Sequence, residues 1–264
     1  MDTPDRWLGP FNPKPKARLR LFCLPHAGGG AVEYRSWPDD LGEDVEVHPV
    51  HLPGRESRLR EPAFDRIDPL VEALIAALGA RLRRPYALFG HSMGALVAFE
   101  LARELRRRSG LAPSHLFLSG RSAPRHPDPA RAVHLLPDAD FIEYLRALNG
   151  TPEVILTDAE MRKLFFPTLR ADFAVCAQYR YREEPPLDVP ITVFGGSRDL
   201  ERTPEILGEW KRETSASFAL HMLPGDHFFV RTAKPLLLSL LGQELVRIAA
   251  QGDGPEEGFG TAGR

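Results

Sequence analysis

The sequence predicts an α/β protein with a mostly parallel central sheet and helices on both faces. Short apolar runs typical of buried strands alternate along the chain with segments whose apolar residues recur at helical spacing. The first strand-like runs end in turns rich in glycine and proline, at residues 25–30 and 52–55. With 264 residues, the chain is long enough for one large domain of this class or for two small ones.

The first half of the chain is expected to supply three strands and three helices. In the longest helical segment, four aliphatic residues between positions 70 and 78 recur at helical spacing. The expected elements, in chain order, are the strand Arg18–Leu24, a short helix Glu33–Leu41, the strand Val45–Val50, the helix Ile67–Leu82, the strand Pro85–Phe89 and the helix Leu96–Arg107.

The second half is expected to add the strands Ser114–Ser119, Ile191–Phe194 and Phe218–Leu223, with a closing helix Leu236–Ala249. Residues 18–250 then form one domain behind an N-terminal extension, residues 1–17. Residues 251–264 are rich in Gly and Glu and have no large apolar side chain except Phe259, so we expect a disordered tail.

An insertion interrupts this alternation at about residues 125–185, where two strands are separated by far more chain than a crossover needs. Its apolar residues form two helical stripes, from Phe141 to Leu148 and from Met161 to Tyr179. We expect Asp138 to cap the first helix and Pro167 to kink or restart the second. Wide apolar faces over the C-terminal edge of a sheet are typical of a substrate-covering lid. The alternative is an ordinary helical elaboration packed on the core.

Composition excludes several classes of function. The net charge is −2, which predicts no nucleic-acid partner and no polybasic membrane surface. No apolar run approaches the ~18 residues of a membrane span, and the first residues lack the pattern of a signal peptide. Two cysteines, Cys23 and Cys176, are too few for a disulfide framework. We therefore expect a cytoplasmic protein, and the sequence offers no cluster of metal ligands.

The most informative motif is Gly90-His91-Ser92-Met93-Gly94, which joins an apolar strand to a helix. A G-x-S-x-G motif alone is a weak signal, and the alternative without a function is a glycine-rich turn with a surface serine. In this context the two glycines relieve crowding at a sharp bend, so that the Ser92 side chain stands clear of the sheet above a helix N-terminus. Ser92 is our candidate nucleophile.

His227 is the candidate base. It follows the strand Phe218–Leu223 on a glycine-containing turn, from which a side chain reaches back over the sheet edge towards Ser92. A neutral imidazole with a pKa near ~6.5 takes up the serine proton and returns it to the leaving group. We expect His91 to point away from the nucleophile by strand alternation.

Asp199 is the candidate acid, because it follows the strand Ile191–Phe194 after two glycines that allow a sharp turn. The chain order Ser, Asp, His is that of the α/β-hydrolase fold. In some members of that fold the acid lies one strand earlier, but here no carboxylate follows Ser119 until Asp128. The alternative acid is Asp226, which precedes His227 directly. Neighbouring side chains on a turn point apart, so that Asp226 would orient the imidazole ring badly.

The oxyanion hole is expected to combine the N–H of Met93 with that of Ala27, in the loop His26–Gly30. Glycine-rich loops also cradle phosphates, but neither G-x-G-x-x-G nor G-K-[ST] follows here, which disfavours a nucleotide site.

Together these motifs resemble the type II thioesterases, discrete α/β-hydrolase enzymes that accompany polyketide synthases and non-ribosomal peptide synthetases. The likeness covers about Arg18 to Ala249. Its further motifs are L-P-H-A-G-G at 24–29, L-P-G-R-E at 52–56, S-G-R at 119–121, L-N-G-T-P at 148–152, L-R-A-D-F at 169–173 and G-D-H-F-F at 225–229. Family members commonly have Gly where this chain has Asn149, and Tyr or Ala near His26.

The resemblance implies hydrolysis of acyl thioesters held on the phosphopantetheine arm of acyl or peptidyl carrier proteins, in editing of stalled or aberrant units. A thiolate is a good leaving group, so that a Ser–His–Asp site suffices without metal or cofactor. We expect a monomer. The alternatives are a product-releasing thioesterase, a carboxylester hydrolase of the same fold, or a non-catalytic interaction protein.

Carrier proteins are acidic, and basic residues occur in and beside the expected lid. Some of these are expected to form a docking patch; the alternative is that they are solvated helix-face charges. The candidates are Arg162, Lys163, Arg170, Arg180 and Arg182.

Overall fold

The computed structural model describes residues 6–8, 12–126 and 132–251. In this part of the chain six strands form one sheet in the order β2-β1-β3-β4-β5-β6, with every neighbouring pair parallel. The strands are β1 (Leu19–Leu24), β2 (Val45–Pro49), β3 (Tyr86–His91), β4 (His115–Ser119), β5 (Ile191–Gly196) and β6 (Phe218–Leu223). The predicted α/β class with a parallel sheet is confirmed.

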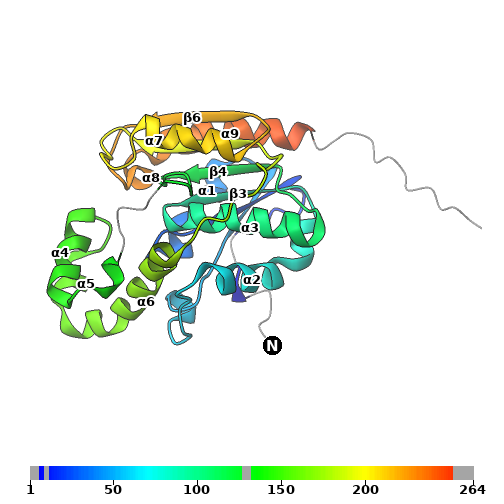
Figure 1. Ribbon diagram of the computed structural model, residues 1–264. Coiled ribbons are helices and arrows are strands. Elements are labelled where there is room, and N and C mark those ends of the chain that lie inside the picture. The colour runs from blue at the N-terminus through cyan, green and yellow to red at the C-terminus, as the bar shows by residue number, and fades with distance from the viewer. Residues whose placement is uncertain (1–5, 9–11, 127–131, 252–264) are drawn as a thin grey trace, which may run out of the picture.

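Helices cover both faces of this sheet (Figure 1). The α-helices are α1 (Trp37–Asp40), α2 (Ile67–Leu78), α3 (Met93–Ser109), α4 (Asp138–Leu148), α5 (Glu153–Thr157), α6 (Ala159–Gln178), α7 (Pro204–Gly208), α8 (Phe229–Thr232) and α9 (Lys234–Gln251). Short 3₁₀ helices are η2 (Ala31–Tyr34), η3 (Glu56–Arg58), η4 (Gly79–Arg83), η5 (Val133–Leu135) and η6 (Glu209–Glu213).

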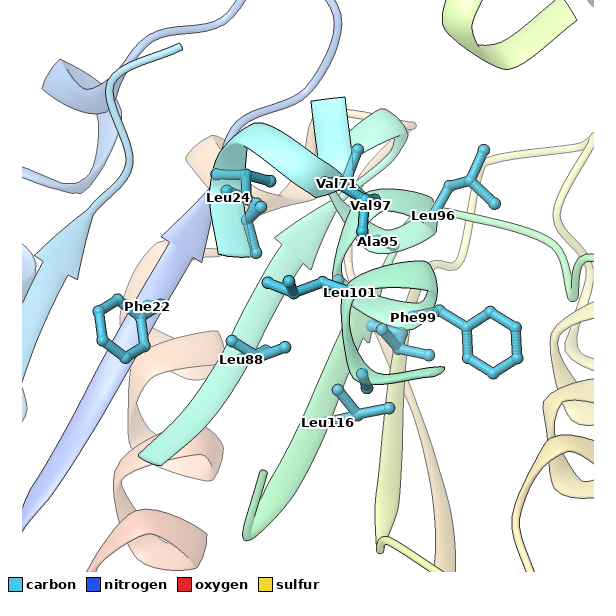
Figure 2. Packing of buried hydrophobic residues seen from close by; sticks show 14 of the residues in the cluster. Phe22, Leu24, Val71, Leu88, Ala95, Leu96, Val97, Phe99, Leu101 and Leu116 are labelled. Carbon is cyan, nitrogen blue, oxygen red and sulfur yellow. The ribbon is translucent and has the colours of Figure 1, made fainter. Parts of the chain in front are cut away.

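The core has two layers, one on each face, because successive side chains of a strand point in opposite directions. In β1, Phe22 and Leu24 join the cluster that contains α2 and α3, whereas Leu21 and Cys23 join the cluster that contains α1 and α9. Figure 2 shows the first layer, where the strand residues lie against the apolar face of α3. These layers fix the strand ends from which the site is built.

Several helices begin or end at residues other than the predicted ones. The expected helix Glu33–Leu41 is two short turns, η2 and α1, and the helix expected to reach Leu82 ends at Leu78 and continues as η4. Helix α3 begins at Met93 rather than Leu96, so that it starts directly after Ser92. Helix α7 was not predicted, because five residues are too few for a helical period to show.

The insertion between β4 and β5 is helical and contains η5, α4, α5 and α6, which lie together at one side of the molecule (Figure 1). It has its own small apolar cluster, to which Phe141 and Phe173 belong. The predicted cap at Asp138 is wrong: Pro137 precedes the first turn of α4, and the Asp138 carboxylate pairs instead with Arg170 at 2.7 Å. Helix α6 runs through Pro167 as one element and does not restart there.

The expected N-terminal extension is partly described: Trp7 and Leu8 are buried in the α2–α3 layer. The expected tail lies outside the described residues beyond position 251. The division into an extension, one domain and a tail remains a prediction. Within the described residues, no helix is long and apolar enough to cross a membrane. Both cysteines are buried and unbonded to each other.

Candidate active site

Ser92 lies in the sharp turn between β3 and α3, with φ 54° and ψ −113°. A non-glycine residue with positive φ is strained and persists only where its surroundings enforce it. Here both glycines of the motif are enforced by close packing. A Cβ on Gly90 would lie 2.1 Å from the carbonyl oxygen of Gly94, and a Cβ on Gly94 would lie 2.2 Å from that of Leu24. The backbone N–H of Ser92 donates to Ser119 O at 2.7 Å, which ties the turn to the end of β4.

Asp199 and His227 are brought together by the loops after β5 and β6. The Nδ1 atom of His227 lies 2.7 Å from Oδ2 of Asp199, and both side chains are buried. The two loops are bonded to each other, since the Arg198 N–H donates to Gly225 O at 2.8 Å. This contact occupies Nδ1, so that Nε2 is the ring nitrogen available for chemistry.

The His227 ring lies beside the turn that carries Ser92. A Cβ built on Gly120, the residue after β4, would be 3.4 Å from Cε1 of His227. The preceding residue, Ser119, accepts the backbone N–H of Ser92. Ser92, Asp199 and His227 therefore follow β3, β5 and β6 at the same edge of the parallel sheet, and Asp199 and His227 are in direct contact.

The electrostatics of the pair favour a neutral base and an ionised acid. Burial lowers the pKa of His227 and outweighs the hydrogen bond that His227 donates to Asp199, which raises this pKa; the charge of Arg202 lowers the pKa further. Burial raises the pKa of Asp199, but the hydrogen bond with His227 and the charge of Arg202 bring it below its ordinary value. Arg202 Nη1 lies 3.5 Å from Asp199 Oδ1.

The competing residues have other partners. The Asp226 carboxylate accepts the Phe228 N–H at 2.9 Å and so caps its own turn. His91 is fully buried, with Nδ1 2.9 Å from Ser119 Oγ, although its ring centroid is 5.1 Å from that of His227. His26 Nε2 lies 2.9 Å from Glu33 Oε2.

The two expected oxyanion donors lie on adjoining segments. Met93 opens α3, where the first N–H groups of a helix have no acceptor within the helix. His26 O accepts the Gly29 N–H at 2.9 Å, and in a trans peptide the N–H points opposite to the C=O. The Ala27 N–H is therefore directed away from that turn. The contact of Gly94 with Leu24 O brings the start of α3 against this loop.

A cavity of about 250 Å³ adjoins the oxyanion loop. Its walls come from that loop, η2, the turn after β2, the insertion and α8, and include Ala27, Val32, Ile155, Phe165, Leu169 and Arg231. A larger hollow of about 510 Å³ lies elsewhere, beside Arg66, Glu100 and Tyr179. The smaller cavity is lined by Ala27, the predicted oxyanion donor, whereas its lining does not include Ser92, Asp199 or His227.

Among the described residues, no group of three or more His, Cys, Asp or Glu side chains is arranged to hold a metal ion. The basic residues considered for docking are partly neutralised. Lys163 pairs with Glu160, Arg170 with Asp138 and Arg182 with Asp68. Arg162 and Arg180 donate to backbone carbonyl groups, and these contacts do not neutralise their charge.

Sequence reasoning missed three charged groups near the site. Arg202 flanks Asp199, Arg231 bonds Glu33 at the cavity wall, and Arg55 pairs with a carboxylate of α6. For Arg202 the signal was its spacing of three residues from Asp199. The acidic partners of Arg231 and Arg55, which are Glu33 and Asp172, lie more than a hundred residues away in sequence, and no local pattern reveals them.

Comparisons with known proteins place this geometry in context. A family model described as a thioesterase domain matches residues 19–244. The chain is 43% identical to the gramicidin S biosynthesis protein GrsT of Aneurinibacillus migulanus, over 93% of this chain and 96% of GrsT. Among solved structures, RedJ, the thioesterase of the prodiginine pathway in Streptomyces coelicolor, superposes with a TM-score of 0.82 at 44% identity, covering 89% of this chain and 90% of RedJ. BorB, a type II thioesterase from the borrelidin biosynthetic cluster, gives 0.83 at 36% identity, covering 93% and 99%.

Proposed function

Because this chain belongs to the thioesterase family, among the type II enzymes of polyketide and non-ribosomal peptide systems, we propose that Ser92, His227 and Asp199 are its catalytic triad. We further propose that its substrates are acyl thioesters on the phosphopantetheine arm of acyl or peptidyl carrier proteins. The observation that carries the site assignment is the 2.7 Å contact between His227 and Asp199 beside the strained turn at Ser92.

In the proposed first step Ser92 Oγ attacks the thioester carbonyl carbon while His227 Nε2 takes the hydroxyl proton. Asp199 holds the ring so that Nδ1 carries its proton and Nε2 has a free lone pair, and it stabilises the imidazolium that forms. The negative oxygen is stabilised by the N–H groups of Ala27 and Met93. The carbon–sulfur bond breaks, and His227 returns the proton to the departing thiolate.

In the second step water attacks the acyl group on Ser92, with His227 again accepting the proton. The products are a free carboxylic acid and the thiol of the carrier arm, and Ser92 is regenerated. The buried surroundings that lower the pKa of His227 keep it neutral at physiological pH, as a base must be.

The cavity beside Ala27 suits a short acyl chain, since its walls include the aliphatic side chains of Val32, Ile155 and Leu169. Editing by hydrolysis needs no cofactor, nucleic acid or membrane, and the proposal keeps the expectations of a monomer that works in the cytoplasm beside its synthase. Release of a finished product is the alternative role for the same chemistry.

The test compares an acyl carrier protein thioester with an oxygen ester of the same acyl group, using the parent enzyme and Ser92→Ala. The parent is expected to prefer the thioester, and Ser92→Ala is expected to lose more than ~10³-fold of that activity while remaining folded. Ser92→Ala activity within about tenfold of the parent would refute the nucleophile assignment. A parent that prefers the oxygen ester would favour a carboxylester hydrolase.

A further inference from the structure

A buried ion pair joins the inserted helix α6 to the turn after β2. Arg55 donates from Nη1 to Oδ2 of Asp172 and from Nη2 to Oδ1, each at 2.8 Å. The two side chains are 7% and 3% exposed. Arg55 Nη1 also donates to Gly29 O at 3.0 Å, within the oxyanion loop. A charge this deeply buried is costly unless it is paired, so each residue depends on the other.

Asp172 has a further partner in the oxyanion loop. The N–H of Gly28 donates to Oδ2 of Asp172 at 2.7 Å. Gly28 has φ 74°, and a Cβ at this position would lie 2.3 Å from Cδ2 of Leu169, one turn earlier on α6. Helix α6 therefore packs directly against the backbone of Gly28, and the Asp172 carboxylate accepts the N–H of that backbone.

The Gly28 N–H belongs to the peptide that follows Ala27. The carbonyl of this peptide, Ala27 O, lies 2.8 Å from Nδ1 of His26. The peptide before Ala27 is held by the bond from Gly29 N–H to His26 O. The Ala27 N–H lies in the plane of this preceding peptide, opposite to His26 O, and holding the peptide after Ala27 restricts rotation about the two backbone bonds that join the two planes. Asp172 supplies one of these constraints from a different part of the chain.

We propose that Asp172, held by Arg55, is a positioning residue for the oxyanion hole, and that it ties the formation of this hole to the seating of α6 on the oxyanion loop. This inference rests on the proposed function, since it takes Ala27 as an oxyanion donor. Neither Asp172 nor Arg55 touches the reacting atoms. Their effect appears only when negative charge develops on the substrate oxygen.

The substitution Asp172→Asn tests this inference with little change of shape. Oδ2 of Asp172 accepts from both Arg55 and Gly28, and Oδ1 accepts from Arg55 alone. An amide has one acceptor oxygen and one NH₂ donor, so that in either orientation its NH₂ group faces an N–H donor, and the contacts of the carboxylate cannot all be kept. The expected result is a fall in kcat of roughly 10- to 100-fold, smaller than the ~10²- to 10³-fold loss of an oxyanion donor itself. KM is expected to change by less than about threefold, because ground-state contacts remain.

Two inhibitors distinguish a loss of oxyanion-hole positioning from a general disruption of the substrate site. An acyl trifluoromethyl ketone binds through a negatively charged adduct with Ser92, so that its affinity for Asp172→Asn is expected to fall in proportion to kcat/KM. A non-hydrolysable thioether analogue has no such oxygen and is expected to bind the variant and the parent equally. Equal loss for both inhibitors would overturn the inference.

The matched control is Glu100→Gln, which neutralises another buried carboxylate, paired with Arg103 at 2.7 Å on α3. This change is expected to lower the melting temperature but to leave kcat within about twofold, since the partners of Glu100, Arg103 and Tyr179, belong neither to the oxyanion loop nor to the proposed triad. If Asp172→Asn does not fold, the double variant Arg55→Met/Asp172→Leu replaces the ion pair by apolar groups and is expected to recover stability.

The kcat of the double variant is expected to stay low, because leucine offers no acceptor for the Gly28 N–H. Recovery of kcat together with stability would overturn the inference. Labelling with a fluorophosphonate serine probe keeps the two proposals apart. A parent labelled at Ser92 together with a fully active Asp172→Asn would refute only the positioning role. A parent not labelled at Ser92 would refute the proposed function itself.

Discussion

Replacing Asp199 by Asn exchanges one carboxylate oxygen of the proposed triad for an NH₂ group, and the local geometry predicts the effect. Arg202 Nη1 lies 3.5 Å from Oδ1 of Asp199, on the side of the carboxylate away from the histidine contact. In Asp199→Asn the amide oxygen is favoured towards this cation, which turns the NH₂ group towards Nδ1 of His227. That nitrogen must then accept, and the ring proton moves to Nε2.

A histidine protonated at Nε2 cannot take the proton of Ser92. The expected cost is about 10⁴-fold in kcat. At about 1.36 kcal/mol for each factor of ten, this is roughly 5 kcal/mol of transition-state stabilisation. The assay follows release of free thiol from a soluble acyl thioester, with a thiol reagent as indicator.

The matched control is Asp226→Asn, one residue from His227. Its Oδ1 accepts the Phe228 N–H at 2.9 Å, and an amide oxygen accepts the same bond. We expect kcat to stay within about threefold of the parent. Equal losses in the two variants, or a larger loss in Asp226→Asn, would refute the assignment of Asp199.

The same geometry makes three further predictions. Activity is expected to rise with pH as His227 loses its proton, with a midpoint below the ~6.5 of a free imidazole. Arg202→Gln is expected to move that midpoint upward, because it removes a charge that lowers the pKa of His227. A kcat/KM–pH profile that is the same in the variant and the parent contradicts this. Gly94→Ala is expected to destabilise the fold and nearly abolish activity, since its Cβ would lie 2.2 Å from Leu24 O, and a variant with the parental melting temperature would refute the packing. Carrier-bound acyl groups are expected to be hydrolysed with higher kcat/KM than the same groups on a short thiol, by a margin that shrinks as salt rises; an advantage that is absent or independent of salt would exclude electrostatic docking.

The sheet was predictable because its strands are short apolar runs bounded by turns, and each expected strand corresponds to an observed one within two residues. The start of α3 was placed three residues too late, since Met93 and Gly94 carry no helical periodicity; the contact with Leu24 fixes them. The order of the strands in the sheet depends on long-range packing, which local sequence patterns do not reveal.

At the site, the chain order was enough to predict that Asp199 pairs with His227, as their 2.7 Å contact shows, and the role of Ser92 remains a prediction. Of the charges around them, Arg202 has a local signal in its spacing from Asp199, whereas the long-range ion pairs have none. Arg55 and Asp172 lie 117 residues apart, and their pairing depends on where α6 crosses the oxyanion loop. Three of the five basic residues considered for docking have acidic partners. Glu160 lies three residues before Lys163 on α6, whereas Asp138 and Asp68 become neighbours of Arg170 and Arg182 only in the folded chain.

The most direct test of the account is to trap the acyl-enzyme. The parent enzyme is mixed with an acyl carrier protein thioester, quenched with acid at short times and analysed by intact mass and peptide mapping. The account predicts an acyl adduct on the peptide that contains Ser92, formed before free acid is released and absent from Ser92→Ala. An adduct on another residue, or release of the acyl group by Ser92→Ala at the parental rate, would contradict it.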